Sequence, residues 1–158
     1  ECLFHHTNDD AIDADFSNGT INNCVFEHCK ENAIDIMMSS LTVHSITIIG
    51  SQNKAINVKD GAELIGDNIN INNSYIAISA EDLSTIGLKN VNIIETTFGI
   101  LSYKNKTGAG HPEVKVAQVK FSNVKQNYLK EKKCLLHLNN IDIQEEVENV
   151  ERIIKNKK

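Results

Sequence analysis

The stretch Ala-Ile-Asp-Ile-Met at residues 33–37 decides the fold, because its pattern returns every 22 residues. Apolar and polar residues alternate within it, and alternation with β-branched residues is typical of a β-strand. We call this stretch and its equivalents the anchor strands. The equivalents are Ala-Ile-Asp-Ala-Asp at 11–15, Ala-Ile-Asn-Val-Lys at 55–59, Ala-Ile-Ser-Ala-Glu at 77–81 and Gly-Ile-Leu-Ser-Tyr at 99–103.

The sequence between the anchor strands repeats as well. Cys-Leu-Phe-His-His at 2–6 returns as Cys-Val-Phe-Glu-His at 24–28, again 22 residues later. A second β-rich stretch follows the anchor strands, for example at 41–49 and 86–94, and Gly and Asn mark the turns between them. Helical spacing is absent through residue 103, so the pattern favours strands throughout this region.

A short repeat of constant length predicts a solenoid in which each repeat forms one coil. Neighbouring coils then pair in parallel about 4.8 Å apart, so that equivalent residues form columns. Burying a branched aliphatic side chain is worth about 1.5–3 kcal/mol, so a column of five contributes on the order of ten kcal/mol. The expected inward column consists of Ile12, Ile34, Ile56, Ile78 and Ile100.

The repeat resembles the right-handed parallel β-helix family, which includes pectate-lyase-like and polygalacturonase-like enzymes. The resemblance covers residues 1–129 and lies in the motif Asn-x-x-Phe or Asn-x-x-Ile, followed by Ala/Gly-Ile-Asp/Asn/Ser. It implies an all-β fold, a right-handed parallel β-helix of about six 22-residue coils. Enzymes of this family generally have more coils than that.

The chain divides into a β-helix at residues 1–143 and a C-terminal cap or tail at 144–158. A polar insertion at 104–113 interrupts the β-helix, and apolar residues at helical spacing predict a capping helix over 145–154. Residues 1–10 resemble the second half of a coil. We therefore expect the rest of a longer β-helix chain N-terminal to residue 1.

Composition limits the classes of protein that fit. The chain has 158 residues, of which 41% are hydrophobic and 23% charged, so it should fold. No apolar run reaches the roughly 20 residues of a membrane span. The formal net charge is −5: residues 1–103 carry a net charge of −10, whereas the Lys-rich residues 104–158 carry +5. Such a charge gives no sign of nucleic-acid binding.

Acidic residues fall in neighbouring outward columns of the predicted coils. Asp13 and Asp35 should lie about 5 Å apart on adjacent strands, with Asp15 diagonal to Asp35. Three interpretations stay open: a structural acidic ladder, a Ca²⁺ site at Asp13 and Asp35, or catalytic acids at all three positions. Asn8-Asp9-Asp10 resembles the paired-aspartate segment of polygalacturonases, but their companion motifs are absent.

Histidines and cysteines also share columns. His6 and His28 should stack on adjacent coils, with His5 pointing the opposite way, and the equivalent later positions are Gly50, Asn72 and Ile94. Since zinc sites need three or four converging ligands, a pair of stacked histidines is the preferred interpretation. Cys2 and Cys24 lie within disulfide range of each other, and free thiols are expected.

These features predict a carbohydrate-associated module, a C-terminal fragment of a larger secreted or cell-surface protein. A polysaccharide would lie along the outward face of the anchor strands, where Asn57, Lys59, Glu81 and Tyr103 are the candidate binding residues. One alternative is a structural or adhesive spacer without a site. A second alternative is a fragment of a polysaccharide lyase or glycoside hydrolase. The resemblance to pectate lyases implies an Arg beside bound Ca²⁺ as the catalytic base, but the only Arg, Arg152, lies in the predicted cap, which counts against a lyase.

Overall fold

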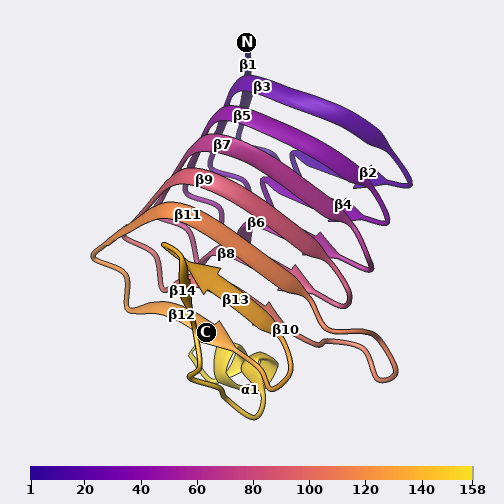
Figure 1. The fold of residues 1–158 in the computed structure, drawn as a ribbon. Helices are drawn as coiled ribbons and strands as arrows, with labels where there is room; N and C mark the ends of the chain where they lie inside the picture. Colours follow the sequence, from indigo (N-terminus) through magenta and orange to yellow (C-terminus); the bar gives the residue numbers. More distant parts are fainter. Residues whose placement is uncertain (158) are drawn as a thin grey trace.

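Each repeat forms one coil of a parallel β-solenoid in the computed structural model, which describes residues 1–157 (Figure 1). The anchor sheet contains β2 (Ile12–Asp15), β4 (Ile34–Met37), β6 (Lys54–Lys59), β8 (Ile76–Glu81), β10 (Phe98–Tyr103) and β12 (Gln126–Lys130). The second sheet contains β1 (Cys2–His5), β3 (Asn18–Glu27), β5 (Ser40–Ile49), β7 (Glu63–Asn72), β9 (Thr85–Ile94), β11 (Glu113–Ser122), β13 (Leu135–Leu138) and β14 (Ile141–Asp142).

The strand register confirms the predicted inward column. Ile34 pairs with Ile12 on one side and with Ile56 on the other, and the column continues through Ile78 and Ile100. From Ile34 onward these side chains are fully buried. The predicted all-β fold of about six stacked coils with parallel sheets is therefore confirmed.

The long strands of the second sheet bend in the middle. Each ten-residue strand holds one residue there with a positive φ between 52° and 58°, a conformation that Asn adopts more easily than most residues. The Asn68 Nδ2 donates a hydrogen bond of 3.0 Å to the Ser45 Oγ of the preceding coil. Each long strand therefore covers two sides of the coil. The bend residues are Asn23, Ser45, Asn68, Asn90 and Gln118.

The turns change length at the third coil. Two residues, 38–39, connect β4 to β5, whereas three residues, 60–62, connect β6 to β7. Ser40 consequently pairs with Glu63, 23 residues later, while the anchor strands keep their 22-residue step. The corner column that contains His28 therefore continues through Gly50, Asn73 and Glu95, and the expected positions Asn72 and Ile94 are displaced by one residue.

The C-terminal segment closes the last coil. β14 pairs antiparallel with β13, and the Val147 N–H donates to the Lys130 carbonyl at 2.8 Å. The Asn139 side chain pairs with both backbone groups of Val119, which lies on the exposed edge of β11. These contacts satisfy strand edges that would otherwise be free to pair.

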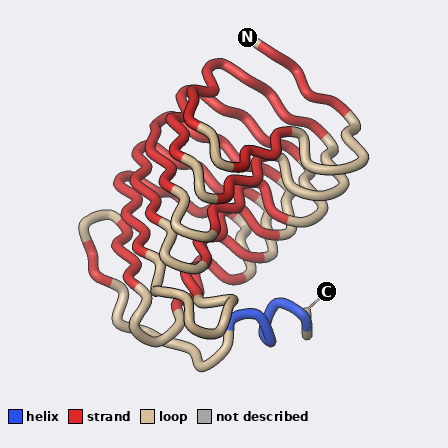
Figure 2. Tube along the Cα trace, turned by 90° about the vertical axis from the view of Figure 1, so that its right-hand side faces the viewer, coloured by secondary structure: helices blue, strands red, loops and turns tan. Residues whose placement is uncertain are grey.

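The only helix among residues 1–157 is α1 (Val150–Lys155), shorter than the predicted 145–154. It begins late because Val147 pairs as a strand and Asn149 caps the helix, its Oδ1 accepting from the Arg152 N–H at 2.6 Å. The helix lies beside the last coils (Figure 2). No helix in this part of the chain is long and apolar enough to cross a membrane.

The tail covers the outward face of the anchor sheet in the last three coils. Val150 is buried there, and Ile153 and Ile154 pack beside it. The Tyr75 hydroxyl donates a hydrogen bond of 2.7 Å to the Ile154 carbonyl. The segment therefore forms a second apolar core on the outside of the solenoid. Its anchor-sheet members are Ile76, Phe98, Leu101, Tyr103 and Leu129.

We expect the substitution Ile56→Ala to destabilise the fold by about 2–5 kcal/mol, because it leaves a cavity at the centre of the inward column. Urea unfolding followed by circular dichroism measures this loss. Ile65→Ala is the matched control, since Ile65 is 48% exposed on β7 and should change the stability by less than about 0.5 kcal/mol. Equal losses in the two variants would contradict the column.

Candidate functional site

The outward face of the anchor sheet changes character along the solenoid. The first two coils present acidic side chains, the middle coils hold paired charges, and the last coils are apolar and covered by the tail. Each coil contributes three residues to this outer face, at a step of 22 residues as far as β10 and of 28 residues from β10 to β12, because the insertion at 104–113 lies between them. In order from the first coil they are Asp10, Asp13 and Asp15; Asn32, Asp35 and Met37; Lys54, Asn57 and Lys59; Ile76, Ser79 and Glu81; Phe98, Leu101 and Tyr103; and Gln126, Leu129 and Glu131.

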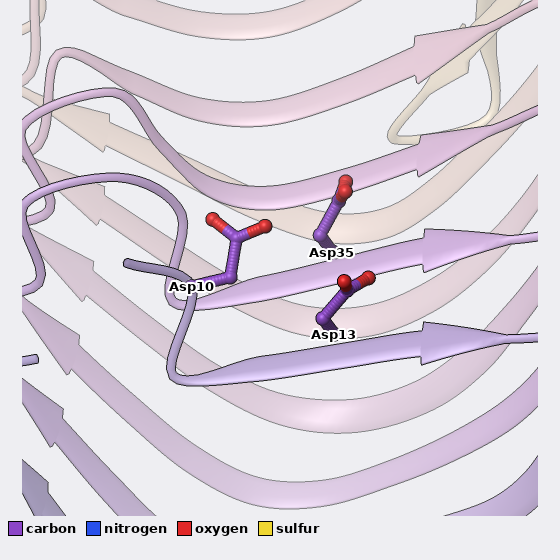
Figure 3. A group of neighbouring side chains, drawn as sticks. All are labelled: Asp10, Asp13 and Asp35. Atoms are coloured by element: carbon purple, nitrogen blue, oxygen red, sulfur yellow. The ribbon is translucent and has the colours of Figure 1, made fainter. Parts of the chain in front are cut away.

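Three carboxylates meet at the acidic end of this face (Figure 3). Oxygen atoms of Asp10, Asp13 and Asp35 lie within 4.8 Å of one another, and among the described residues no other group of three His, Cys, Asp or Glu meets this geometry. Asp13 and Asp35 are adjacent, as predicted, but Asp15 lies opposite Met37 and is not part of the group. Asp10 joins it from the bend before β2.

The acidic cluster raises the pKa of two of its members. Partial burial raises the pKa of Asp13, and the negative charges of Asp15 and Asp35 raise it further. Burial also raises the pKa of Asp10; the backbone hydrogen bond from Asn32 opposes this, and Asp35 adds to it. A bound cation would relieve this repulsion, and a set of carboxylate oxygens suits Ca²⁺.

Both carboxylate oxygens of Asp35 contact side chains of the third coil. Its Oδ1 accepts a hydrogen bond of 2.6 Å from the Asn57 Nδ2, and its Oδ2 pairs with the Lys59 ammonium. Burial acts to lower the pKa of Lys59, but the hydrogen bond and charge of Asp35 outweigh it, so that the pKa is raised. Asp35 is therefore held as a structural carboxylate.

Glu81 is the centre of a second buried network. Its Oε1 accepts from the Lys54 Nζ at 2.5 Å, the Tyr103 hydroxyl at 2.8 Å and the Ser79 hydroxyl at 3.1 Å. Burial acts to raise the pKa of Glu81, but Lys54 and these hydrogen bonds hold it below its usual value. Burial and the adjacent Glu81 charge raise the pKa of Tyr103. The hydroxyl therefore acts as a hydrogen-bond donor.

The residues expected to bind a glycan are mostly inaccessible. Asn57, Glu81 and Tyr103 are only 4%, 2% and 3% exposed, and Lys59 is partly buried. Their own network and the tail cover them. The expectation that these outward side chains face solvent is thus corrected: they point away from the inner core into a second buried layer. These three side chains therefore offer little surface to a glycan in this conformation.

An open polar groove lies instead along the corner before the anchor strands. It has a volume of about 670 Å³ and crosses coils two to six. A second hollow of about 410 Å³ continues it toward the first coil and shares His28 and Gln52 with it. The sequence signal that could have indicated this groove is the recurrence of Asn, Ser and Thr at the turns. The groove is lined by His28, Gly50, Ser51, Gln52, Asn73, Ser74, Tyr75, Glu95, Thr96, Thr97, Asn123 and Lys125.

The cysteines form no disulfide. Cys2 lies opposite Cys24 in the register of β1 and β3, and both are free thiols, as expected. Cys29 and Cys134 are buried and free. Burial raises the pKa of the Cys134 thiol to about 11, so this group is protonated and unreactive near neutral pH.

No protein-family model matches the chain, and neither does any curated protein sequence or any solved structure. The assignment to a parallel β-solenoid therefore rests on the repeat and the strand register. The likeness to pectate-lyase-like and polygalacturonase-like enzymes is a likeness of repeat pattern.

We expect Glu81→Gln to destabilise the fold by about 3–5 kcal/mol at neutral pH, because it leaves the Lys54 ammonium without its buried counter-charge. Folding lowers the pKa of Glu81, so its contribution is present above the unfolded pKa and is lost as the pH falls through the folded pKa. Urea unfolding at several pH values should show the difference between the wild type and the variant shrinking in acid. A difference that does not change with pH would argue against this network.

We expect Asp13→Asn to raise the melting temperature slightly in the presence of a chelator. Folding raises the pKa of Asp13, so the carboxyl favours folding below its unfolded pKa, and this effect is lost as the pH rises through the folded pKa. If the cluster holds Ca²⁺, millimolar Ca²⁺ should stabilise the wild type and leave the variant unchanged. Asp15→Asn is the control, because Asp15 lies outside the cluster. Equal Ca²⁺ shifts in wild type and Asp13→Asn would exclude the site.

Proposed function

We propose that this chain is a non-catalytic carbohydrate-binding module whose glycan lies in the corner groove. The observation that carries the proposal is the continuous polar hollow crossing coils two to six. Four steps between coils of about 4.8 Å each span about 20 Å, so the hollow is long and suits an extended chain. Amide, hydroxyl and imidazole groups line it, and such groups donate to and accept from sugar hydroxyls.

The groove replaces the anchor face as the proposed binding surface. Gln52, Asn73 and Lys125 are exposed along it, whereas the anchor-face candidates Asn57, Glu81 and Tyr103 are buried. The groove carries Glu95 and Lys125 as opposite charges, which favours a neutral or weakly charged polysaccharide. A polysaccharide partner goes with a location outside the cell or at its surface, and we include that location in the proposal.

A glycan array with the purified chain tests this function. We expect binding to a polysaccharide class that weakens at least about tenfold in Gln52→Ala and Lys125→Ala, since each removes a side chain from the groove. Lys89→Ala is the matched control, because Lys89 is an exposed lysine on β9 outside the groove. Binding that survives both groove substitutions would place the glycan elsewhere, and an array blank at high protein concentration would overturn the function.

A structural or adhesive spacer without a site is the second candidate, and the regular parallel stacking of the coils favours it. Phe4, Ile12 and Ala14 are only partly buried, whereas the equivalent Phe26, Ile34 and Ile36 of the second coil are fully buried. A blank glycan array leaves this candidate in place.

A lyase or hydrolase activity fits the geometry less well. Both oxygens of Asp35 are engaged by Asn57 and Lys59, so this carboxylate is not poised to transfer a proton. Asp13 and Asp10 lie beside it on the acidic end of the outer face, away from the corner groove. The proposed function therefore contains no catalytic step.

A further inference from the structure

Three histidines gather at the corner of the first two coils. The ring centroids of His5 and His6 are 3.9 Å apart, those of His6 and His28 are 5.0 Å apart, and those of His5 and His28 are 5.9 Å apart. All three residues are exposed. This cluster lies at the first-coil end of the corner groove, because His6 and His28 line the hollow of about 410 Å³.

The backbone explains why His5 joins the other two. His6 and His28 have positive φ angles of 55° and 57°, so the strand alternation ends at these residues. The ring of His5 therefore turns toward the same side as the ring of His6. The expectation that His5 points the opposite way is corrected, and with it the conclusion that a third imidazole is missing.

The ring of His5 lies within hydrogen-bond distance of a carboxylate. The Nδ1 of His5 lies 3.0 Å from the Glu27 Oε2 on the next coil. Histidines that ligate metals commonly donate their other ring N–H to a carboxylate, which fixes the tautomer and orients the ring. In this arrangement the Nδ1–H donates to Glu27, and the Nε2 of His5 is left free as a ligand.

We propose that His5, His6 and His28 form a binding site for a divalent transition metal of the Zn²⁺ class. Imidazole nitrogens bind Zn²⁺ at about 2.0–2.1 Å, which places the ring centroids of tetrahedral neighbours about 5 Å apart. The three observed separations bracket this value. No set of one nitrogen from each of the three rings lies within 4.8 Å of one another in the structure, so metal binding requires the exposed rings to turn about their side-chain bonds. The adjoining hollow leaves the fourth position open to water or another ligand.

The site differs in chemistry from the acidic cluster. Imidazole nitrogens suit Zn²⁺, Ni²⁺ and Cu²⁺, whereas the oxygens of Asp10, Asp13 and Asp35 suit Ca²⁺. The histidine site also does not depend on the proposed glycan function. A metal held at this corner would sit at one end of the groove.

Isothermal titration of the untagged chain with ZnCl₂ at about pH 7.5 tests the site, since the imidazoles must be neutral to bind. We expect one equivalent of Zn²⁺, with affinity falling at least about tenfold in His28→Asn and about tenfold in Glu27→Gln. Asn is the suitable replacement because Asn73 and Asn123 hold the same corner position with φ angles of 51° and 54°. Co²⁺ absorption provides a second readout of tetrahedral nitrogen ligation.

Three control variants identify the ligands. His44→Gln should not change the affinity, because His44 has a carboxylate partner, Asp67, at 2.6 Å, but belongs to no histidine cluster. Cys2→Ser tests the exposed thiol, and Asp13→Asn tests the acidic cluster. The proposal is overturned if the wild type binds no Zn²⁺, if His28→Asn binds as tightly as the wild type, or if either Cys2→Ser or Asp13→Asn is the variant that abolishes binding.

Discussion

Parallel pairing in register is the constraint on which the rest of the structure depends. Each residue must be compatible with the residue 22 or 23 positions before it and with its equivalent on the next coil, about 4.8 Å away. Inside the solenoid this requirement is met by stacked Ile side chains such as Ile34 and Ile56. On the outer face it is met by opposite charges, because like charges at that distance repel.

The outer face shows how that electrostatic requirement is satisfied coil by coil. Lys59 on the third coil pairs with Asp35 on the second, and Lys54 pairs with Glu81 on the fourth. Asp13 forms no such ion pair, and desolvation together with the charges of Asp15 and Asp35 raises its pKa. At the other end the columns become apolar, and the tail covers Phe98 and its neighbours. Charge pairing therefore stabilises the middle coils of this outer face, and tail packing covers its last coils.

The sequence predicts whatever follows directly from periodicity. The inward column, the pairing of Asp13 with Asp35 and the stack of His6 on His28 all follow from one step length. Periodicity does not predict the directions of side chains at the bends, and Asp10 and His5 lie where the strand alternation stops. The position of α1 is not predicted by periodicity either, because the contact between Tyr75 and Ile154 joins residues that are 79 positions apart and lies outside the repeat.

The C-terminal segment contacts the strand edges of the last coils. β14, Asn139 and Val147 pair with part of the strand edges at that end, where β12 and β14 are the outermost strands of the two sheets. Open-ended growth into fibres requires two complementary surfaces on every subunit. Pairing part of these edges within the chain reduces the strand-edge surface that a second molecule could join at that end. The C-terminal segment thus limits edge pairing at that end as well as covering apolar residues.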